Sequence, residues 1–343
     1  MNKIAEDPRI DPRIKAIMGM LPSESQGDVE NREQVLAEAN TEEVIAAREE
    51  MQAGFALLDT EENAPSTGLV ISDHEFVSSP DGNTIRVHFI RPEGDDAKPC
   101  VCYLHGGGMS IMSAYDGLYK SWGCIIASKG VAVAMVDFRN CVVASSAPEV
   151  EPFPAGLNDC VSGVKWLHQN ADTLGISSDR IIVAGESGGG NLTLATGLKL
   201  LADGDMGLIK GLYALCPFIA GDWPHPDHPS SVENNGIMLD LHNNRWVHGY
   251  GIEAYERRDY LAWPSFATEA QVSGLVPTVI SVNECDPLRD EGIEFYRKLM
   301  RAGVTARCIQ VMGTVHGTEI FSIACPDVTH DGAARIAEFC RTV

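Results

Sequence analysis

One serine lies in a pattern that is typical of a catalytic nucleophile. Residues 185–189 read Gly-Glu-Ser-Gly-Gly, with Ser187 at the centre. An apolar run precedes the motif and a helical pattern follows it, which is the strand–turn–helix context of a nucleophile elbow. Small residues on both sides of the serine permit a sharp turn that exposes its hydroxyl group. The alternative is a tight connection without chemistry, but the context favours Ser187 as a nucleophile.

A second glycine-rich segment could stabilise negative charge. Residues 105–108 read His-Gly-Gly-Gly and directly follow a strand-like run. Glycines let backbone N–H groups approach a developing alkoxide, so the segment is typical of an oxyanion hole. A phosphate-binding loop is disfavoured because the Lys-Ser/Thr of that motif is absent. We expect the donors to be the N–H groups of Gly107, Gly108 and Gly188.

In a triad whose members occur along the chain in the order serine, aspartate, histidine, the carboxylate comes after the serine. Asp286 lies just past the strand-like segment 278–282, where its side chain can reach the elbow. The residue could instead cap a helix, because Pro287 is a favoured first helical residue. Asp290 and Glu291 are rival carboxylates, which the pattern places in the first turn of that helix. We expect Asp286 to be the acid.

The general base must be a histidine that follows the acid. Of the ten histidines, only His316 and His330 come after Asp286. His316 lies just past the strand-like segment 306–310, whereas His330 leads into the last helical pattern and is typical of a surface or capping residue. A lone histidine is usually structural, but His316 stands where the third member of a triad is needed.

These residues require a parallel sheet to bring them together. Residues 70–77 and 84–90 are strand-like and flank a turn signal, which predicts an antiparallel hairpin. Further strands are expected at 100–104, 131–136, 180–184, 211–216, 278–282 and 306–310, with helices at 116–129, 156–171, 188–203, 289–302 and 331–341. Such alternation predicts an α/β fold with a mostly parallel central sheet that helices cover on both faces.

Two segments lie outside this alternation. Residues 1–65 are rich in Glu, Ala and Met, and residues 31–58 within them are typical of a helix. Residues 218–263 interrupt the strand–helix pattern and include a helical stretch around Trp246 and Tyr250. An insertion of this length in an α/β domain is usually a lid or a binding element.

The composition narrows the classes of function. The chain has 343 residues and a formal charge of −22, which disfavours nucleic acids and anionic membranes as partners. Its ten cysteines contain no CxxC pair, so buried free thiols in a reducing compartment are expected and no metal site is indicated. The first residues lack the apolar region of a signal peptide, and no run of ~18 apolar residues occurs. The cytoplasm is the expected location.

The ordered motifs resemble those of the hormone-sensitive-lipase-like family of α/β-hydrolases, which includes many microbial carboxylesterases. The matching segments are 105–108, 185–189, 286–292 and 316–317, and the resemblance runs from about residue 70 to the C-terminus. It implies an α/β-hydrolase fold with a helical cap. Residues 1–65 fit the N-terminal cap helices, 66–343 the catalytic domain, and 218–263 a cap insertion within that domain.

The chain departs from the family pattern at several positions. Glu186 precedes the serine where the family usually has Asp or Thr, and Gly188 follows it where Ala is frequent. The segment 140–150 looks expanded. Glu319 follows the histidine closely, which places it near the expected site entrance. These changes leave the triad intact but bear on the substrate class.

The sequence therefore predicts a serine carboxylesterase that forms an acyl-enzyme on a small-molecule ester, without cofactor or metal. An amidase, lactonase or acyltransferase with the same triad remains open, and so does a homodimer. A non-catalytic receptor on this fold is disfavoured because such a receptor typically lacks the histidine. Bulky side chains predict an apolar pocket for short, neutral acyl groups, lined by Met109, Ile111, Phe218, Trp223 and Trp246.

Overall fold

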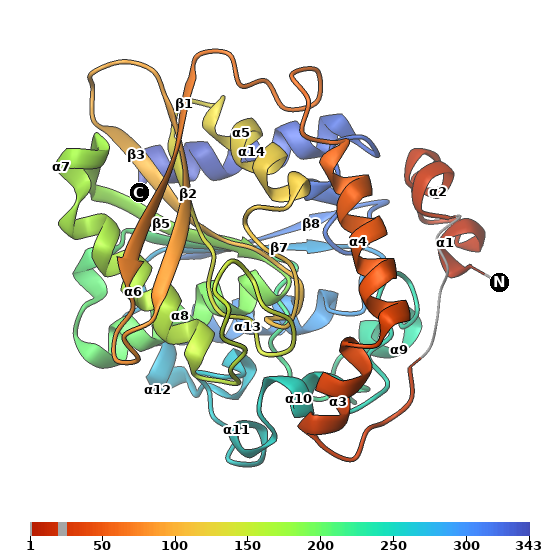
Figure 1. Ribbon diagram of the computed structural model, residues 1–343. Helices are drawn as coiled ribbons and strands as arrows, with labels where there is room; N and C mark the ends of the chain where they lie inside the picture. Colours follow the sequence, from red (N-terminus) through yellow and green to blue (C-terminus); the bar gives the residue numbers. More distant parts are fainter. Residues whose placement is uncertain (1, 20–25) are drawn as a thin grey trace.

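An eight-stranded sheet forms the centre of the protein in the computed structural model, which describes residues 2–19 and 26–343 (Figure 1). The strand order is β1-β2-β4-β3-β5-β6-β7-β8. β1 pairs with β2 and β2 with β4 in antiparallel fashion, and the remaining pairs are parallel. The strands are β1 (Leu69–Val77), β2 (Thr84–Pro92), β3 (Lys98–Leu104), β4 (Ala132–Val136), β5 (Ile176–Glu186), β6 (Gly211–Leu215), β7 (Thr278–Asn283) and β8 (Ala306–Val311).

Helices cover both faces of the sheet, as the alternating pattern predicts. α5 (Gly117–Ala127) and α14 (Pro326–Thr342) pack on one face, and α6 (Ala155–Gln169), α8 (Gly188–Asp203) and α13 (Arg289–Arg301) pack on the other (Figure 1). The central strands β4, β6 and β7 are buried along their whole length, because helices shield both of their faces. The predicted α/β-hydrolase architecture is therefore confirmed.

The described part of the N-terminal region contains four helices: α1 (Lys3–Glu6), α2 (Pro12–Met18), α3 (Arg32–Ala39) and α4 (Glu42–Ala56). The expected continuous helix over 31–58 is wrong, because the chain breaks at Asn40 and Thr41. Asn40 ends α3, and the Thr41 side chain accepts a hydrogen bond from the Val44 N–H to begin α4. The side chain of Thr41 thus begins a new helix directly after α3 has ended.

The first two helices pack against loops at the carboxyl ends of the last strands. Ile14 and Met18 belong to a small buried cluster that includes Cys285 and Val315. The Asp11 N–H also donates to the Gly313 carbonyl at 2.9 Å. These contacts support the two loops that carry Asp286 and His316.

The insertion after β6 contains three short helices within long loops: α9 (Ser230–Glu233), α10 (Arg245–Tyr250) and α11 (Ile252–Glu256). α10 contacts α3 of the N-terminal region (Figure 1). The division of the chain into cap and catalytic parts at residue 65 stays a prediction.

The remaining short elements are α7 (Ala171–Leu174), η1 (Met206–Leu208), η2 (Pro264–Phe266), α12 (Glu269–Val272) and η3 (Thr318–Ile320).

All ten cysteines are free, and nine of them are buried, which confirms the expected buried thiols. The largest grouping of apolar side chains lies between the sheet and α6, α8 and α13, and a second one lies beneath α5 and α14. A chain of this size needs no disulfide to complete its core.

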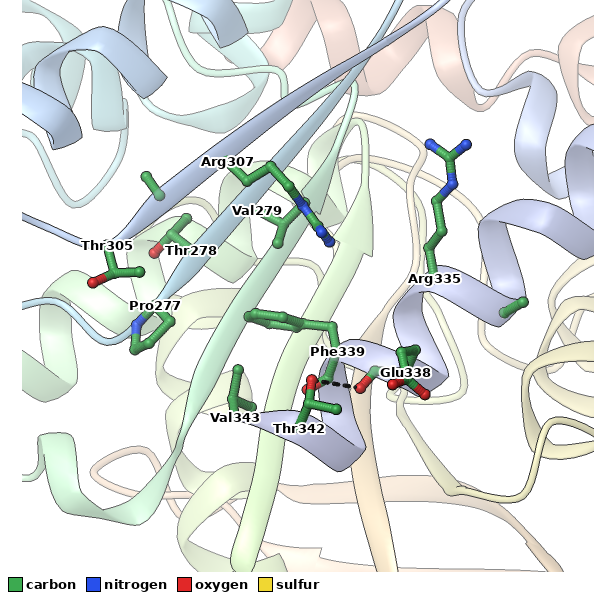
Figure 2. Close-up of a pocket in the computed structure, with 12 residues that line it drawn as sticks. Pro277, Thr278, Val279, Thr305, Arg307, Arg335, Glu338, Phe339, Thr342 and Val343 are labelled. Atoms are coloured by element: carbon green, nitrogen blue, oxygen red, sulfur yellow. Dashed lines mark hydrogen bonds between the residues drawn. The ribbon is translucent and has the colours of Figure 1, made fainter.

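A cavity of about 600 Å³ lies between α14 and the beginnings of β7 and β8 (Figure 2). Thr278 and Ala306, the first residues of these strands, belong to its lining, as do Arg307 and Arg335. Ligand sites of open α/β sheets lie outside the carboxyl ends of the strands. This cavity is at the amino ends and contains none of the predicted site residues.

Candidate active site

Ser187 occupies a sharp turn between β5 and α8. Its backbone has φ 57° and ψ −119°, a conformation that non-glycine residues rarely adopt. The turn has no room for larger neighbours, since a Cβ atom on Gly189 would lie 2.0 Å from the Leu104 carbonyl oxygen. Strain of this kind is typical of functional positions that the surrounding structure holds in place.

Asp286 and His316 come together at the carboxyl ends of β7 and β8. His316 Nδ1 lies 2.8 Å from Asp286 Oδ2, and the other carboxylate oxygen accepts the Leu288 N–H at 2.9 Å. Burial alone would lower the pKa of His316, but the neighbouring Asp286 carboxylate and Cys216 together outweigh it and raise that pKa well above its usual value. Asp286 therefore both shapes its own loop and orients the imidazole.

The rival residues are engaged elsewhere. Asp290 accepts the Ser230 N–H at 2.7 Å and pairs with Arg289. Glu291 is buried and accepts three hydrogen bonds, from the Ile219 and Ala220 N–H groups and from the Trp223 indole. Burial raises the pKa of Glu291 to about 8. In the described part of the chain, neither carboxylate forms a hydrogen bond or an ion pair with a histidine.

His330 lies on α14 and takes part in a different contact. Its Nδ1 is 3.3 Å from Lys129 Nζ, on the outer surface of the helix layer. It does not line the cavity that contains His316 and Ser187. His316 is therefore the only histidine after Asp286 that the described structure brings to the candidate site.

The segment after β3 lies directly beside the nucleophile turn. Gly107 and Gly108 have φ values of +86° and +62°, in the left-handed region that favours glycine. A Cβ atom on Gly188 would lie 2.7 Å from the Gly108 nitrogen, which shows how closely the two segments approach. Within the described residues, the N–H groups of Gly107, Gly108 and Gly188 have no hydrogen-bond acceptor. They are available to bind an oxyanion.

The loop is anchored from beneath by His105. Its ring stacks on Phe138 with the centroids 4.1 Å apart, and its Nε2 lies 3.5 Å from the buried carboxylate of Asp137. Asp137 in turn accepts hydrogen bonds from the Ala114 and Ser146 N–H groups. His105 is fully buried and thus holds the loop rather than facing a substrate.

Ser187, His316 and the two loop glycines line one cavity of about 480 Å³. Ile111, Phe218 and Trp246 also line it, as the sequence predicts. The other apolar lining residues come from the N-terminal helices, the insertion and the segments after β3 and β8: Met18, Met51, Phe55, Met112, Leu118, Met238, Leu239, Leu241, Ile320 and Phe321. The cavity is therefore apolar except where Ser187, His316, Glu186 and Tyr119 line it.

Two residues that were expected to line the pocket, Met109 and Trp223, are packed behind the residues that do line it. Met109 has a positive φ of 58° and its side chain is buried in the core. Trp223 stacks on Phe218 with ring centroids 4.6 Å apart and donates its indole N–H to Glu291. Among the residues that the structure describes, these two are not part of the lining of the cavity.

The two acidic residues near the motifs are both buried. The expectation that Glu319 lies near the entrance is wrong: it is 3% exposed and accepts hydrogen bonds from Asn283 and Ser281. Glu186 lines the cavity but its oxygens are bound by the hydroxyls of Tyr103 and Tyr119. Burial raises the pKa of Glu186 to about 7.

Sequence reasoning did not identify Cys216, which lies beside the histidine. The Cys216 sulfur, an Asp286 oxygen and a His316 nitrogen all lie within 4.8 Å of one another, the one such group with metal-ligand chemistry among the described residues. Burial raises the pKa of the Cys216 thiol to about 11. Its position at the end of β6, in an apolar run, gives no sign of this contact in the sequence.

Residues 2–19 and 26–343 contain no helix that combines the length and hydropathy needed to cross a bilayer.

Comparison with known proteins places these features in context. A family model described as the α/β-hydrolase fold matches residues 101–320. Ethyl acetate hydrolase of Pseudomonas putida is 28% identical over 280 residues, which cover 80% of this chain and 82% of the relative. Among solved structures, esterase Est22 is 65% identical, with a TM-score of 0.99 and coverage of 100% of both chains. Brefeldin A esterase, described as a bacterial homologue of human hormone-sensitive lipase, is 33% identical, with a TM-score of 0.86 and coverage of 98% of this chain and 94% of its own.

Proposed function

The chain belongs to the hormone-sensitive-lipase-like family of α/β-hydrolases and is a carboxylic ester hydrolase, and we propose that it works through a triad of Ser187, His316 and Asp286. One observation carries this proposal. The strained Ser187 and His316 line the same cavity, and His316 Nδ1 lies 2.8 Å from Asp286 Oδ2. A serine, a histidine and an orienting carboxylate are the groups that acyl transfer needs.

In the proposed reaction, Ser187 Oγ attacks the ester carbonyl while the imidazole of His316 takes its proton. The same imidazole then gives this proton to the departing alkoxide, which leaves an acyl group on Ser187. Water attacks the acyl-enzyme with His316 again as the base, and the carboxylic acid is released. Asp286 fixes the tautomer of the imidazole and stabilises its protonated form.

Negative charge develops on the carbonyl oxygen in both steps. The N–H groups of Gly107, Gly108 and Gly188 would donate to this oxygen, since they have no other acceptor in the described residues. Such fixed donors stabilise the transition state more than the ground state, so they raise kcat.

The proposed cap consists of the N-terminal helices and the insertion at 218–263. Support comes from the lining of the cavity, because both segments contribute side chains to it. Met51 and Phe55 come from α4, and Leu241 and Trp246 come from the insertion. Residues far apart in the sequence would thus close one substrate pocket over the triad.

We further propose that short, neutral acyl groups are preferred. The cavity measures about 480 Å³ and bulky rings form part of its wall. Each methylene that fits contributes ~0.8 kcal/mol of burial, whereas overfilling the pocket costs about 1–3 kcal/mol. The specificity constant kcat/KM should therefore peak at acyl chains of roughly two to six carbons.

A substrate panel tests this function. We would measure kcat/KM for nitrophenyl esters of increasing acyl length, together with a matched anilide and a lactone. The proposal expects short esters to be hydrolysed fastest and the anilide far more slowly. A maximum at long acyl chains would contradict the proposed pocket. A preference for the anilide or the lactone would make the chain an amidase or a lactonase with the same triad.

A further inference from the structure

The triad mechanism leaves one buried acidic side chain beside the nucleophile unused. Glu186 is the last residue of β5 and is only 2% exposed. Both of its oxygens accept hydrogen bonds: Oε2 from the Tyr103 hydroxyl at 2.5 Å and Oε1 from the Tyr119 hydroxyl at 2.7 Å. Because each oxygen of this buried carboxylate has a hydrogen-bond donor, the position of the side chain is closely fixed.

One of these two tyrosines also reaches the oxyanion loop. The Gly106 N–H donates to the Tyr119 hydroxyl oxygen at 2.9 Å, while that hydroxyl donates its own proton to Glu186. A Cβ atom on Gly106 would lie 2.3 Å from Glu186 Oε1, so the loop rests directly on the carboxylate. Tyr103 has no bond to the loop in the described structure.

The contact between Glu186 and the loop bears on catalysis because each of the two segments continues directly into a proposed catalytic group. Glu186 is bonded to Ser187, whose strained backbone sets the direction of its hydroxyl. Gly106 is bonded to Gly107, a proposed oxyanion donor. One side chain therefore connects the segment of the nucleophile to the segment of the donors, through a single intervening hydroxyl.

We propose that Glu186 is a positioning residue that sets the oxyanion loop against Ser187 through Tyr119 and the Gly106 N–H. This inference rests on the proposed function, because it assigns the loop to oxyanion binding. An ionised carboxylate accepts from both tyrosines, whereas a glutamine side chain offers one oxygen and an amide that can only donate. Replacement by glutamine would leave one hydroxyl without its acceptor and so weaken the support that Glu186 and Tyr119 give to the loop.

Three variants separate this role from a general effect on the core. Glu186→Gln changes the carboxylate with little change of shape, and Tyr119→Phe removes the link to Gly106. Tyr103→Phe is the matched control, since it removes the other bond to Glu186 and leaves the loop contact in place. For each variant we would measure kcat, KM, the thermal midpoint Tm and the affinity for a trifluoromethyl ketone, which forms an oxyanion when serine adds to it.

We expect Glu186→Gln and Tyr119→Phe to lower kcat by about 10- to 100-fold, because loss of one oxyanion donor costs about 10²–10³ and these changes displace donors without deleting them. KM should change by less than about threefold, and affinity for the ketone should fall by the same factor as kcat. Tyr103→Phe should lower Tm but leave kcat within about threefold, because its hydroxyl does not touch the loop.

The inference is overturned if folded Glu186→Gln and Tyr119→Phe keep the kcat and ketone affinity of the wild type, or lose no more than Tyr103→Phe does. If Glu186→Gln does not fold, Glu186→Asp replaces it, since the shorter acid keeps the charge but cannot reach both tyrosines. Ser187→Ala separates the two proposals. An active Ser187→Ala enzyme would refute the proposed function, whereas an inactive one with unaffected loop variants would refute only the role of Glu186.

Discussion

Helices α8 and α4 both border the candidate active site, but they are held in opposite ways. Twelve of the 16 residues of α8 are buried, and Asn191 ties the helix to the insertion through the Phe218 and Ala262 carbonyls. None of the 15 residues of α4 is fully buried, although Met51 and Phe55 line the cavity. The proposed nucleophile is thus next to a well-buried helix, whereas part of the proposed substrate wall is on a less buried one.

This difference predicts two kinds of variant. Changes around the buried turn at Ser187 should lower kcat, because the positions of reacting groups must be held to fractions of an ångström. Changes on α4 should alter the range of substrates and leave catalysis nearly intact, since weakly packed elements adjust at little cost. The following tests are ordered by the size of the expected effect.

The largest effect is expected from Ser187→Ala, in the turn directly before the well-buried helix α8. Removal of a nucleophilic serine costs about 10⁶-fold in kcat in enzymes of this mechanism, so ester hydrolysis should fall to background. The smaller side chain should not unfold the protein, and circular dichroism with a thermal melt would check this. Residual turnover close to that of the wild type would place the nucleophile elsewhere.

Asp286→Asn should lower kcat by roughly 10⁴, because an amide favours the wrong imidazole tautomer. The Asp286 charge raises the pKa of His316, so its loss should move the acid limb of the kcat/KM profile to lower pH. Asp290→Asn is the control, since its carboxylate binds Ser230 and Arg289 instead. A larger loss in the control than in Asp286→Asn would reverse the assignment of the acid.

A moderate effect is expected from Phe55→Ala on α4. The truncated side chain enlarges the cavity, and each further methylene that an acyl chain can bury contributes ~0.8 kcal/mol, about fourfold in kcat/KM. The optimum acyl length should therefore rise while kcat for short esters stays within about threefold. Leu57→Ala is the control, because Leu57 is 74% exposed and lies outside the cavity. An unchanged optimum in Phe55→Ala would show that α4 does not limit the acyl chain.

The smallest effect concerns the charge of the substrate. With Glu319 buried in the interior, repulsion of a substrate carboxylate arises from Glu186, which lines the cavity, and from the net charge of −22. A unit charge about 10 Å away in water contributes ~0.4 kcal/mol, so a neutral diester should exceed its monoacid only about twofold for each such charge. Measurement of both substrates at low and high ionic strength should show this gap narrowing with salt. A preference for the monoacid would indicate a cationic group in the pocket.

The sheet and the residues at its carboxyl end could be predicted from the sequence because their signals are local. β3, β6 and β8 coincide closely with the strands expected from the sequence, and each motif residue follows the end of a strand within a few residues. Ser187 and His316 share a cavity because parallel strands bring their ends to one edge. Motif residues that are far apart in the sequence therefore lie close together in the fold.

The pocket wall was less accessible to sequence reasoning because it depends on contacts between distant segments. Nothing local in the acidic pattern around Met51 indicates that it lines the same cavity as Ser187. Met109 and Trp223 were placed in the wall because they are bulky and close in sequence to lining residues, but packing put them one layer behind. Glu319 is expected at the entrance because it follows His316 closely in the sequence, although Asn283 and Ser281 hold it in the interior.

Covalent labelling with a fluorophosphonate tests the central claim most directly. The reagent reacts with a serine hydroxyl that a neighbouring base activates, and peptide mass mapping then identifies the modified residue. We expect one adduct on the wild-type protein, located at Ser187, and no adduct on the folded Ser187→Ala variant. An adduct on another residue, or equal labelling of the variant, would contradict the account.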